Sequence, residues 1–356
     1  MKRSILRKIA AGSAALLAAI SLIGCTAKIV VEDYAKTVVA TFGDENIYLS
    51  EPIFFLRSNQ MYMEMLYSGS FSDMSVFWSY QGTNGKTYGN SLKEDAMAAV
   101  LQTRILKQNA GSYGVELTEA DNTKINEAAT EYFATINESL IAATGVTEDI
   151  LIDIYTNNAI ANKVWEAIVA DVDTYVSDEE ARQVSISYIQ VDEDADDPDW
   201  AKTTAEAMLA RAEAGEDLDT IAGDYDMAAN PMTLGANETI ELNATAMSLK
   251  SGEFAMVTNG ENGYYVIYCV SELDETATNT RKDAIISERK AEIFNTVYES
   301  LKASAPKFVL VDKVWDTINL DTMIYVPETT SDVTVTEETT MEASIEETTE
   351  EETAAE

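Results

Sequence analysis

Histidine is absent from this chain of 356 residues. That absence excludes serine–histidine–aspartate and cysteine–histidine catalytic pairs, and it excludes metal sites built on imidazole. Carboxylates are plentiful, but the acidic run at 192–199 lacks the turn glycine and the closing glutamate of an EF-hand loop. No glycine-rich phosphate-binding motif is present either. We therefore predict neither a metal site nor a cofactor.

Positive charge is scarce as well. Lysine and arginine number 24 against 62 acidic residues, which gives a net charge of −38. A chain this acidic repels the phosphates of nucleic acids and the surface of anionic lipids. We expect no nucleic-acid partner, and attachment to a membrane would need a covalent tether.

The N-terminus has the features of such a tether. A short apolar stretch at 9–23 follows four positive charges, Lys2, Arg3, Arg7 and Lys8. This order is typical of an export signal, and the stretch is too short to span a bilayer comfortably. It ends in Leu-Ile-Gly-Cys25, which resembles the bacterial lipobox. The resemblance implies cleavage after residue 24 and a lipid on Cys25; a plain signal peptide with an incidental cysteine is the alternative.

Cysteine is nearly absent, since Cys269 is the only one besides Cys25. With Cys25 acylated, no disulfide within the chain is possible. Cys269 lies in an apolar strand and is predicted to be a small core residue. Stability must then come from packing.

Apolar and polar periodicity predicts a hairpin followed by helices. Strands at 37–42 and 47–49 flank a turn, and Ser50 is a plausible N-cap for a helix that ends near Tyr67. The aromatic-rich stretch at 69–90 is interpreted as a loop pinned onto the domain, with a surface that grips unfolded segments as the alternative.

Three amphipathic helices are predicted next, because apolar residues recur there at helical spacing. The second is opened by Thr118 and Asp121 and runs until Gly145 breaks it. The third is capped by Thr147. At Ser177 the capping-box spacing marks the entry to a second unit.

The second unit contains two apolar strands, at 184–191 and 263–268. Between them we predict a helix at 200–214, a short helix near 218–222 and a loop around Leu234 and Gly235. A long helix at 280–301 and a short strand at 308–312 follow. The tail at 327–356 has only acidic charges and many threonines, and it cannot bury enough apolar surface to fold.

Short motifs in this second unit resemble the parvulin family of peptidyl-prolyl isomerases. Residues 214–225 read Ala-Gly-Glu-Asp-Leu-Asp-Thr-Ile-Ala-Gly-Asp-Tyr, and residues 249–253 read Leu-Lys-Ser-Gly-Glu. The opening at 39–47, Val-Ala-Thr-Phe-Gly-Asp-Glu-Asn-Ile, resembles the start of SurA and PrsA chaperone domains. The resemblance implies an α+β fold, in which a mostly helical SurA-like domain carries an inserted parvulin-like domain.

The resemblance also implies a division of the chain. We expect a lipoprotein signal peptide at 1–24, a tether at 25–33, a SurA-like chaperone domain at 34–176, a parvulin-like domain at 177–276, a returning helix at 277–326 that completes the chaperone domain, and a disordered tail at 327–356.

Active parvulins have a cleft with two facing histidines, a cysteine or aspartate, and a methionine and phenylalanine that seat proline. By resemblance, the histidine positions fall on Tyr188 and Tyr265, and the cysteine or aspartate position falls on Asp226. The proline-seating positions fall near Glu238 and Leu242. The large residue of the family's Ala-Phe pair is Met247. No residue is assigned as catalytic, and any isomerase activity is expected to be weak or absent.

We therefore predict a lipid-anchored, extracytoplasmic foldase of the PrsA/SurA type from a bacterium, more specifically a Gram-positive one. Its partners would be unfolded or nascent exported polypeptides. Two alternatives stay open: an active peptidyl-prolyl isomerase with a divergent cleft, and a non-catalytic scaffolding lipoprotein. The sequence does not specify the oligomeric state.

Overall fold

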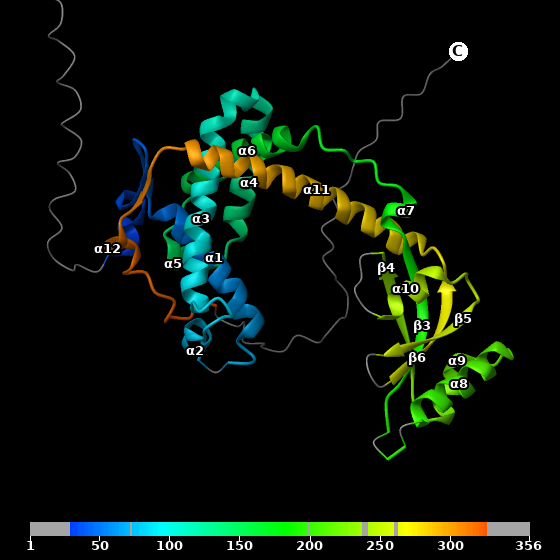
Figure 1. Cartoon of the computed structure of the whole chain (residues 1–356). Helices are drawn as coiled ribbons and strands as arrows, with labels where there is room; N and C mark the ends of the chain where they lie inside the picture. The colour runs from blue at the N-terminus through cyan, green and yellow to red at the C-terminus, as the bar shows by residue number, and fades with distance from the viewer. Residues whose placement is uncertain are drawn as a thin grey trace, which may run out of the picture.

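The computed structural model describes residues 29–71, 73–194, 196–197, 199–236, 241–259 and 263–325, with only the backbone of Glu241. A helical body and a four-stranded module are joined by one long helix, α11 (Glu275–Ser304) (Figure 1). The predicted α+β class with a mostly helical part is confirmed. The predicted signal peptide, Cys25, Glu238 and the acidic tail lie outside the described residues.

A small antiparallel sheet closes the helical body. Strands β1 (Val38–Phe42) and β2 (Glu45–Tyr48) form the predicted hairpin, and Gly43 in its turn has a φ of +57°. The C-terminal strand β7 (Phe308–Leu310) pairs with the other edge of β1. A strand from the C-terminal part of the chain therefore completes the sheet that the N-terminal hairpin begins.

The prediction that Ser50 is an N-cap is wrong. Helix α1 (Ser50–Tyr67) already includes Ser50, and its N-cap is Leu49, which makes no side-chain capping bond. Leu49 is fully buried in the main core. A side-chain cap contributes only about 1 kcal/mol, which is less than the burial of a leucine side chain contributes. We infer that burial of Leu49 fixes where the chain enters the helix.

The body contains more helices than were predicted. The stretch expected to be a loop holds the helix α2 (Met74–Ser79), before α3 (Tyr88–Asn109). The predicted second helix is two helices, α4 (Glu119–Thr135) and α5 (Glu138–Thr144). They separate because Asn137 caps α5, accepting a hydrogen bond from the Ser139 amide at 2.8 Å.

Two predicted caps of the body are confirmed. Thr118 and Asp121 form a reciprocal capping box at the start of α4. Thr147 caps α6 (Glu148–Val169) by accepting from the Ile150 amide. Short 3₁₀ turns at Val31–Lys36 and Ala110–Tyr113 complete the body, together with the one-turn helix α12 (Asp312–Trp315).

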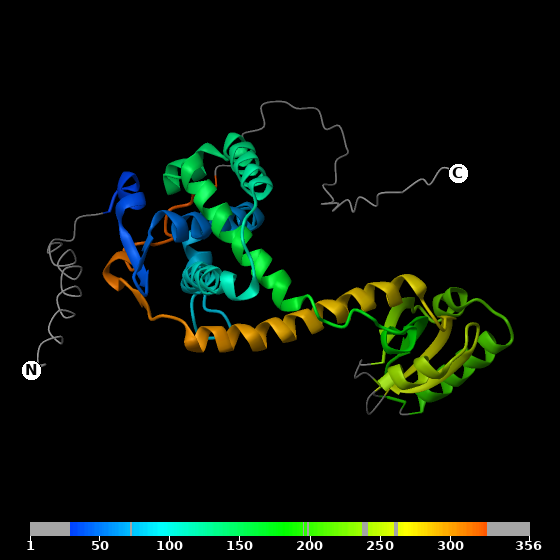
Figure 2. The same cartoon turned by 90° about the horizontal axis from the view of Figure 1, so that it is seen from above.

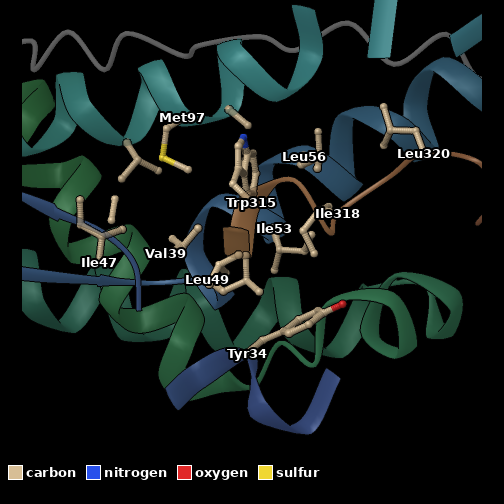
Figure 3. Packing of buried hydrophobic residues seen from close by; sticks show 14 of the residues in the cluster. Tyr34, Val39, Ile47, Leu49, Ile53, Leu56, Met97, Trp315, Ile318 and Leu320 are labelled. Carbon is tan, nitrogen blue, oxygen red and sulfur yellow. The ribbon is translucent and has the colours of Figure 1, made fainter. Parts of the chain in front are cut away.

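The main core of the body combines both ends of the chain. Figure 3 shows Trp315, Ile318 and Leu320 of the C-terminal segment packed among residues of the N-terminal hairpin and α1. Each of these three side chains is buried. The body therefore depends on its C-terminal segment for packing as well as for strand pairing.

The module is an antiparallel sheet in the order β4-β3-β6-β5. Its strands are β3 (Gln183–Val191), β4 (Ala229–Gly235), β5 (Phe254–Asn259) and β6 (Gly263–Ser271). The prediction of a loop around Leu234 and Gly235 is wrong, because both belong to β4, which pairs along β3. Pro231 lies in this strand, and proline is tolerated there since β4 is at the edge of the sheet.

Helices cover both faces of the module's sheet. Helices α8 (Trp200–Glu213) and α9 (Leu218–Asp224) pack on one face, and α10 (Glu241–Ser248), which the periodicity did not predict, packs on the other. The helix α7 (Asp178–Ala181), capped by Ser177, leads into β3.

Helix α11 bridges the body and the module, as Figure 2 shows. It begins at Glu275, earlier than the predicted residue 280, because Asp274 caps it by accepting from the Ala277 amide. Phe294 packs in a cluster of the body, whereas Ile285 packs with Val176 and Ala181 where the module begins.

Candidate functional site

The candidate site lies on the face of the module's sheet that α10 covers. Side chains alternate along a strand, so Ile189 and Val191 of β3 pack toward α8 and α9. Ile186 and Tyr188 belong to the cluster on the other face, with Tyr265 of β6. The strand register therefore brings the two tyrosines to one surface.

The rings of Tyr188 and Tyr265 are in direct contact. Their centroids are 5.4 Å apart and their planes meet at 86°, which is an edge-to-face arrangement. Both side chains are half-buried. Because the rings touch each other, the space between them cannot hold a proline ring.

Helix α10 contributes two more of the predicted residues. Leu242 is 2% exposed and Met247 is half-buried, and both belong to the same cluster as the tyrosine pair. Leu242 thus points from α10 into the core, so its side chain is not available to line an open cleft. Met247 is the more accessible of the two.

Asp226 is not brought to this surface. It is exposed on the turn between α9 and β4, and its φ of 57° is in the left-handed region. The adjacent Met227 packs with the cluster of α8 and α9, on the opposite face of the sheet. Glu238 lies outside the described residues.

Cys269 is fully buried and free, so the prediction of a small core residue is confirmed. Burial raises the pKa of its thiol, which keeps the sulfur protonated and unreactive. In the parts of the chain that the structure describes, no group of three or more metal-ligating acidic or thiol side chains comes together.

A second candidate surface lies on the helical body. It is formed by seven exposed large side chains at the end of α1, on α2 and around the start of α3, and we name it the α1–α2 surface: Tyr62, Met65, Leu66, Tyr67, Val76, Tyr80 and Tyr88. Ring contacts link three of its tyrosines, since Phe77 stacks on Tyr67 and also contacts Tyr88, which contacts Tyr80.

Charge is nearly absent from the segment that forms this surface. Between residues 58 and 92 the only charged side chains are Glu64, Asp73 and Lys86, and Glu64 is fully buried. The sequence alone signalled only the aromatics at 69–90. The exposed apolar residues of α1 were not predicted.

Two surface pockets lie away from both candidate surfaces. One, of about 330 Å³, is between the end of α6 and α11; the other, of about 500 Å³, is between the β1–β2 turn and α3. Arg289 lines the first and Arg104 the second. Neither pocket includes Tyr188 or Tyr265, so neither is the predicted isomerase cleft.

The fold and the site define an α+β protein in which a helical body carries a four-stranded module with a tyrosine pair on one face. No protein family model matches the chain, and no curated protein matches it. The solved structures to which it is similar include those of the foldase PrsA and of SurA-like chaperones.

Three of these structures illustrate the likeness. PrsA from Bacillus cereus is 15% identical with a TM-score of 0.33, covering 67% of this chain and 95% of that chain. PrsA from Lactococcus lactis is 15% identical with a TM-score of 0.29, covering 82% and 100%. A SurA-like chaperone from Campylobacter jejuni is 13% identical with a TM-score of 0.28, covering 77% and 99%.

No helix within the described ranges has both the length and the apolar character that crossing a bilayer requires.

Proposed function

We propose that this protein is an extracytoplasmic foldase of the PrsA/SurA type that binds unfolded exported polypeptides. In this proposal a lipid on Cys25 anchors it to the outer face of a bacterial cell membrane, in a Gram-positive host. Its parvulin-like module contributes contacts to the client, with little or no isomerase activity. The observation that carries the proposal is the α1–α2 surface.

The chemistry of the α1–α2 surface suits the binding of clients that differ in sequence. Contiguous exposed apolar side chains mark interaction sites. Tyrosine supplies large contact area at low entropic cost, and the serines, glycines and asparagines between the aromatics supply adaptable hydrogen bonds. Because the segment carries almost no exposed charge, an apolar part of a client can contact it without burying a charged side chain.

The tyrosine pair supports binding over catalysis. Rotation about an X–Pro bond crosses a barrier of about 18–20 kcal/mol, and an enzyme must stabilise the twisted amide with polar groups around an apolar slot. Here the two positions that would hold histidines carry tyrosines in contact with each other. A client would meet a closed apolar surface there.

The net charge of −38 supports a covalent anchor. A protein of this charge is repelled by anionic headgroups, so residence at a membrane requires acyl chains that contribute about 0.8 kcal/mol per buried methylene. The lipobox-like sequence before Cys25 provides the attachment point.

The test is suppression of aggregation of a chemically unfolded protein by the soluble chain that starts after Cys25. The variant Tyr62→Ser with Leu66→Ser removes two exposed side chains of α1. At a cost of about 1 kcal/mol each, we expect the concentration needed for half-suppression to rise by roughly tenfold or more. The matched control is Tyr175→Ser, which is exposed but outside this surface.

If the unaltered protein at excess leaves aggregation unchanged, the proposal is wrong and a scaffolding role remains. If it suppresses aggregation and the double variant does so equally well, the α1–α2 surface is not where the client binds. The control separates both outcomes from a general effect of losing exposed aromatic area.

A further inference from the structure

The sheet of the module has two edges, and they differ. The β4 edge contains Pro231, which interrupts the row of backbone donors that an edge strand presents. The β5 edge has the sequence Phe-Ala-Met-Val-Thr-Asn, with no charged residue, proline or glycine. Natural proteins often protect an edge strand with a charged residue or a proline, because an unprotected edge pairs with other chains.

The hydrogen-bond pattern shows which groups of β5 point outward. The Cys269 amide donates to the Glu253 carbonyl at 2.9 Å. The carbonyl of Glu253, the residue just before β5, therefore points toward β6. In an antiparallel ladder such residues alternate with residues whose groups point outward, and Phe254, Met256 and Thr258 therefore direct their N–H and C=O groups away from β6. None of these outward groups has a hydrogen-bond partner among the residues that the structure describes.

Both faces beside this edge offer apolar contacts to an added strand. Met256 is half-buried against the cluster of α8 and α9, and Val257 is half-buried in the cluster that contains the tyrosine pair. Successive side chains of an added strand point to opposite faces, so alternate residues would lie next to each of these clusters.

We propose that the β5 edge binds an extended segment of an unfolded polypeptide as a fifth strand of the sheet. This inference rests on the proposed function and specifies a second place where the client is held. The bond donors and acceptors are main-chain groups, which every polypeptide has, while the flanking clusters favour alternating apolar residues. Such binding tolerates many sequences.

The charge of the module determines which segment fits. Residues 177–273 contain 21 acidic residues and four basic ones, Arg182, Lys202, Arg211 and Lys250. A neutral or basic segment is attracted or tolerated, whereas a second copy of this module would be repelled. The occupant is therefore a neutral or basic strand from another protein.

The first experiment uses a fluorescein-labelled peptide in which valine alternates with threonine or lysine. Fluorescence anisotropy measures its binding to the full soluble chain. The variant Thr258→Pro removes an outward N–H from an exposed position without breaking a bond to β6. We expect affinity to fall by at least about tenfold. Thr258→Ser keeps the N–H and is the matched control, with unchanged affinity.

The second experiment needs no altered protein. The same peptide with every backbone amide N-methylated has no main-chain N–H donors, and we expect it not to bind the unaltered chain. Bound unmethylated peptide is also expected to slow amide hydrogen exchange at Phe254, Met256 and Thr258.

Equal binding of the methylated peptide, or unchanged exchange at these three amides, overturns the inference. So does a dimer in sedimentation that Thr258→Pro dissociates, since the edge would then serve a second copy. Aggregation suppression by the unaltered chain is measured in parallel. If it persists while the strand-addition results are negative, only this inference fails; if it is absent while the peptide binds β5, the proposed function fails.

Discussion

Tyr188 and Tyr265 are the residues on which the question of catalysis depends. A histidine imidazole can donate or accept a proton near neutral pH, and neither position carries a histidine. The two rings also contact each other edge to face, a contact worth about 0.5–1.5 kcal/mol beyond their buried area. Both facts argue against catalysis at this surface.

The first prediction concerns this pair. In a protease-coupled proline isomerisation assay, the unaltered chain and the variant Tyr188→Ala with Tyr265→Ala should both give near-background rates, because the two tyrosine rings contact each other and leave no room for a proline ring between them. A histidine-containing parvulin is the positive control. A clear rate for the unaltered chain that the double variant loses would establish a divergent active isomerase instead.

Asp121 gives a prediction about pH. Its carboxylate accepts hydrogen bonds from the amide and hydroxyl of Thr118, both at 2.8 Å, and lies 3.2 Å from the ammonium of Lys163. The backbone bond first, then the hydroxyl and lysine contacts, lower its pKa from 3.8 to about 2. Because the folded pKa is below the unfolded one, the stabilisation is present above about pH 4 and is lost as the pH falls toward 2.

The variant Asp121→Asn should therefore be less stable than the unaltered chain at neutral pH, and the difference should shrink between about pH 4 and pH 2. Urea midpoints measured across this range test it. Asp153→Asn, at an exposed position on α6, is the control. A difference that stays constant with pH would show that the carboxylate charge of Asp121 contributes nothing to the capping box.

At the scale of elements, patterns with local causes were predicted and patterns set by tertiary contacts were not. The capping box at Thr118 and the cap at Thr147 involve residues three apart, so the sequence displays them directly. The strand β4 contains a proline and a glycine, and only its pairing with β3 makes it a strand. No local signal could have distinguished it from a loop.

The candidate site was likewise predicted in part. Sequence motifs placed Tyr188, Tyr265 and Met247 together, and the structure places all three in one cluster. Asp226 was placed by analogy across a loop, and it is exposed on the turn between α9 and β4, outside this cluster. The part of the α1–α2 surface that belongs to α1 was not predicted, because an exposed apolar stripe and a buried one have the same periodicity.

The end of the described C-terminal segment depends on a buried carboxylate in α1. Glu64 is fully buried, and its carboxylate accepts from the amides of Ile324 and Tyr325 at 2.8 and 2.9 Å. Gln60 donates to Glu64 at 2.6 Å and to the Thr322 carbonyl at 3.0 Å. These bonds hold the last described residues against α1.

The variant Glu64→Met should leave the two backbone amides without their acceptor, at a cost of about 1–3 kcal/mol. We expect faster hydrogen exchange at Ile324 and Tyr325 and a lower free energy of unfolding. Glu127→Met, at an exposed position on α4, should change stability by less than about 0.5 kcal/mol. Unchanged exchange at the two amides would contradict a clamping role for Glu64.

At the scale of the whole molecule, the helical body and the module have separate cores. The clusters of the body contain residues from α1 to α6 and the C-terminal segment, whereas those of the module contain residues of β3 to β6 and α8 to α10. Where α11 passes between them, only Val176, Ala181 and Ile285 form a small shared cluster. Arg289 adds hydrogen bonds to the carbonyls of Asp173 and Tyr175.

Because so few contacts join the two cores, we expect the body and the module to unfold in separate transitions in urea. Ile221 is fully buried in the module and Leu151 in the body, so each tests one core. Ile221→Ala should destabilise the module by about 2–5 kcal/mol and leave the transition of the body in place, and Leu151→Ala should do the reverse. Far-UV circular dichroism measures both transitions. If each substitution shifts one common transition, α11 couples the two units into a single cooperative structure, and a client bound on either surface would stabilise both.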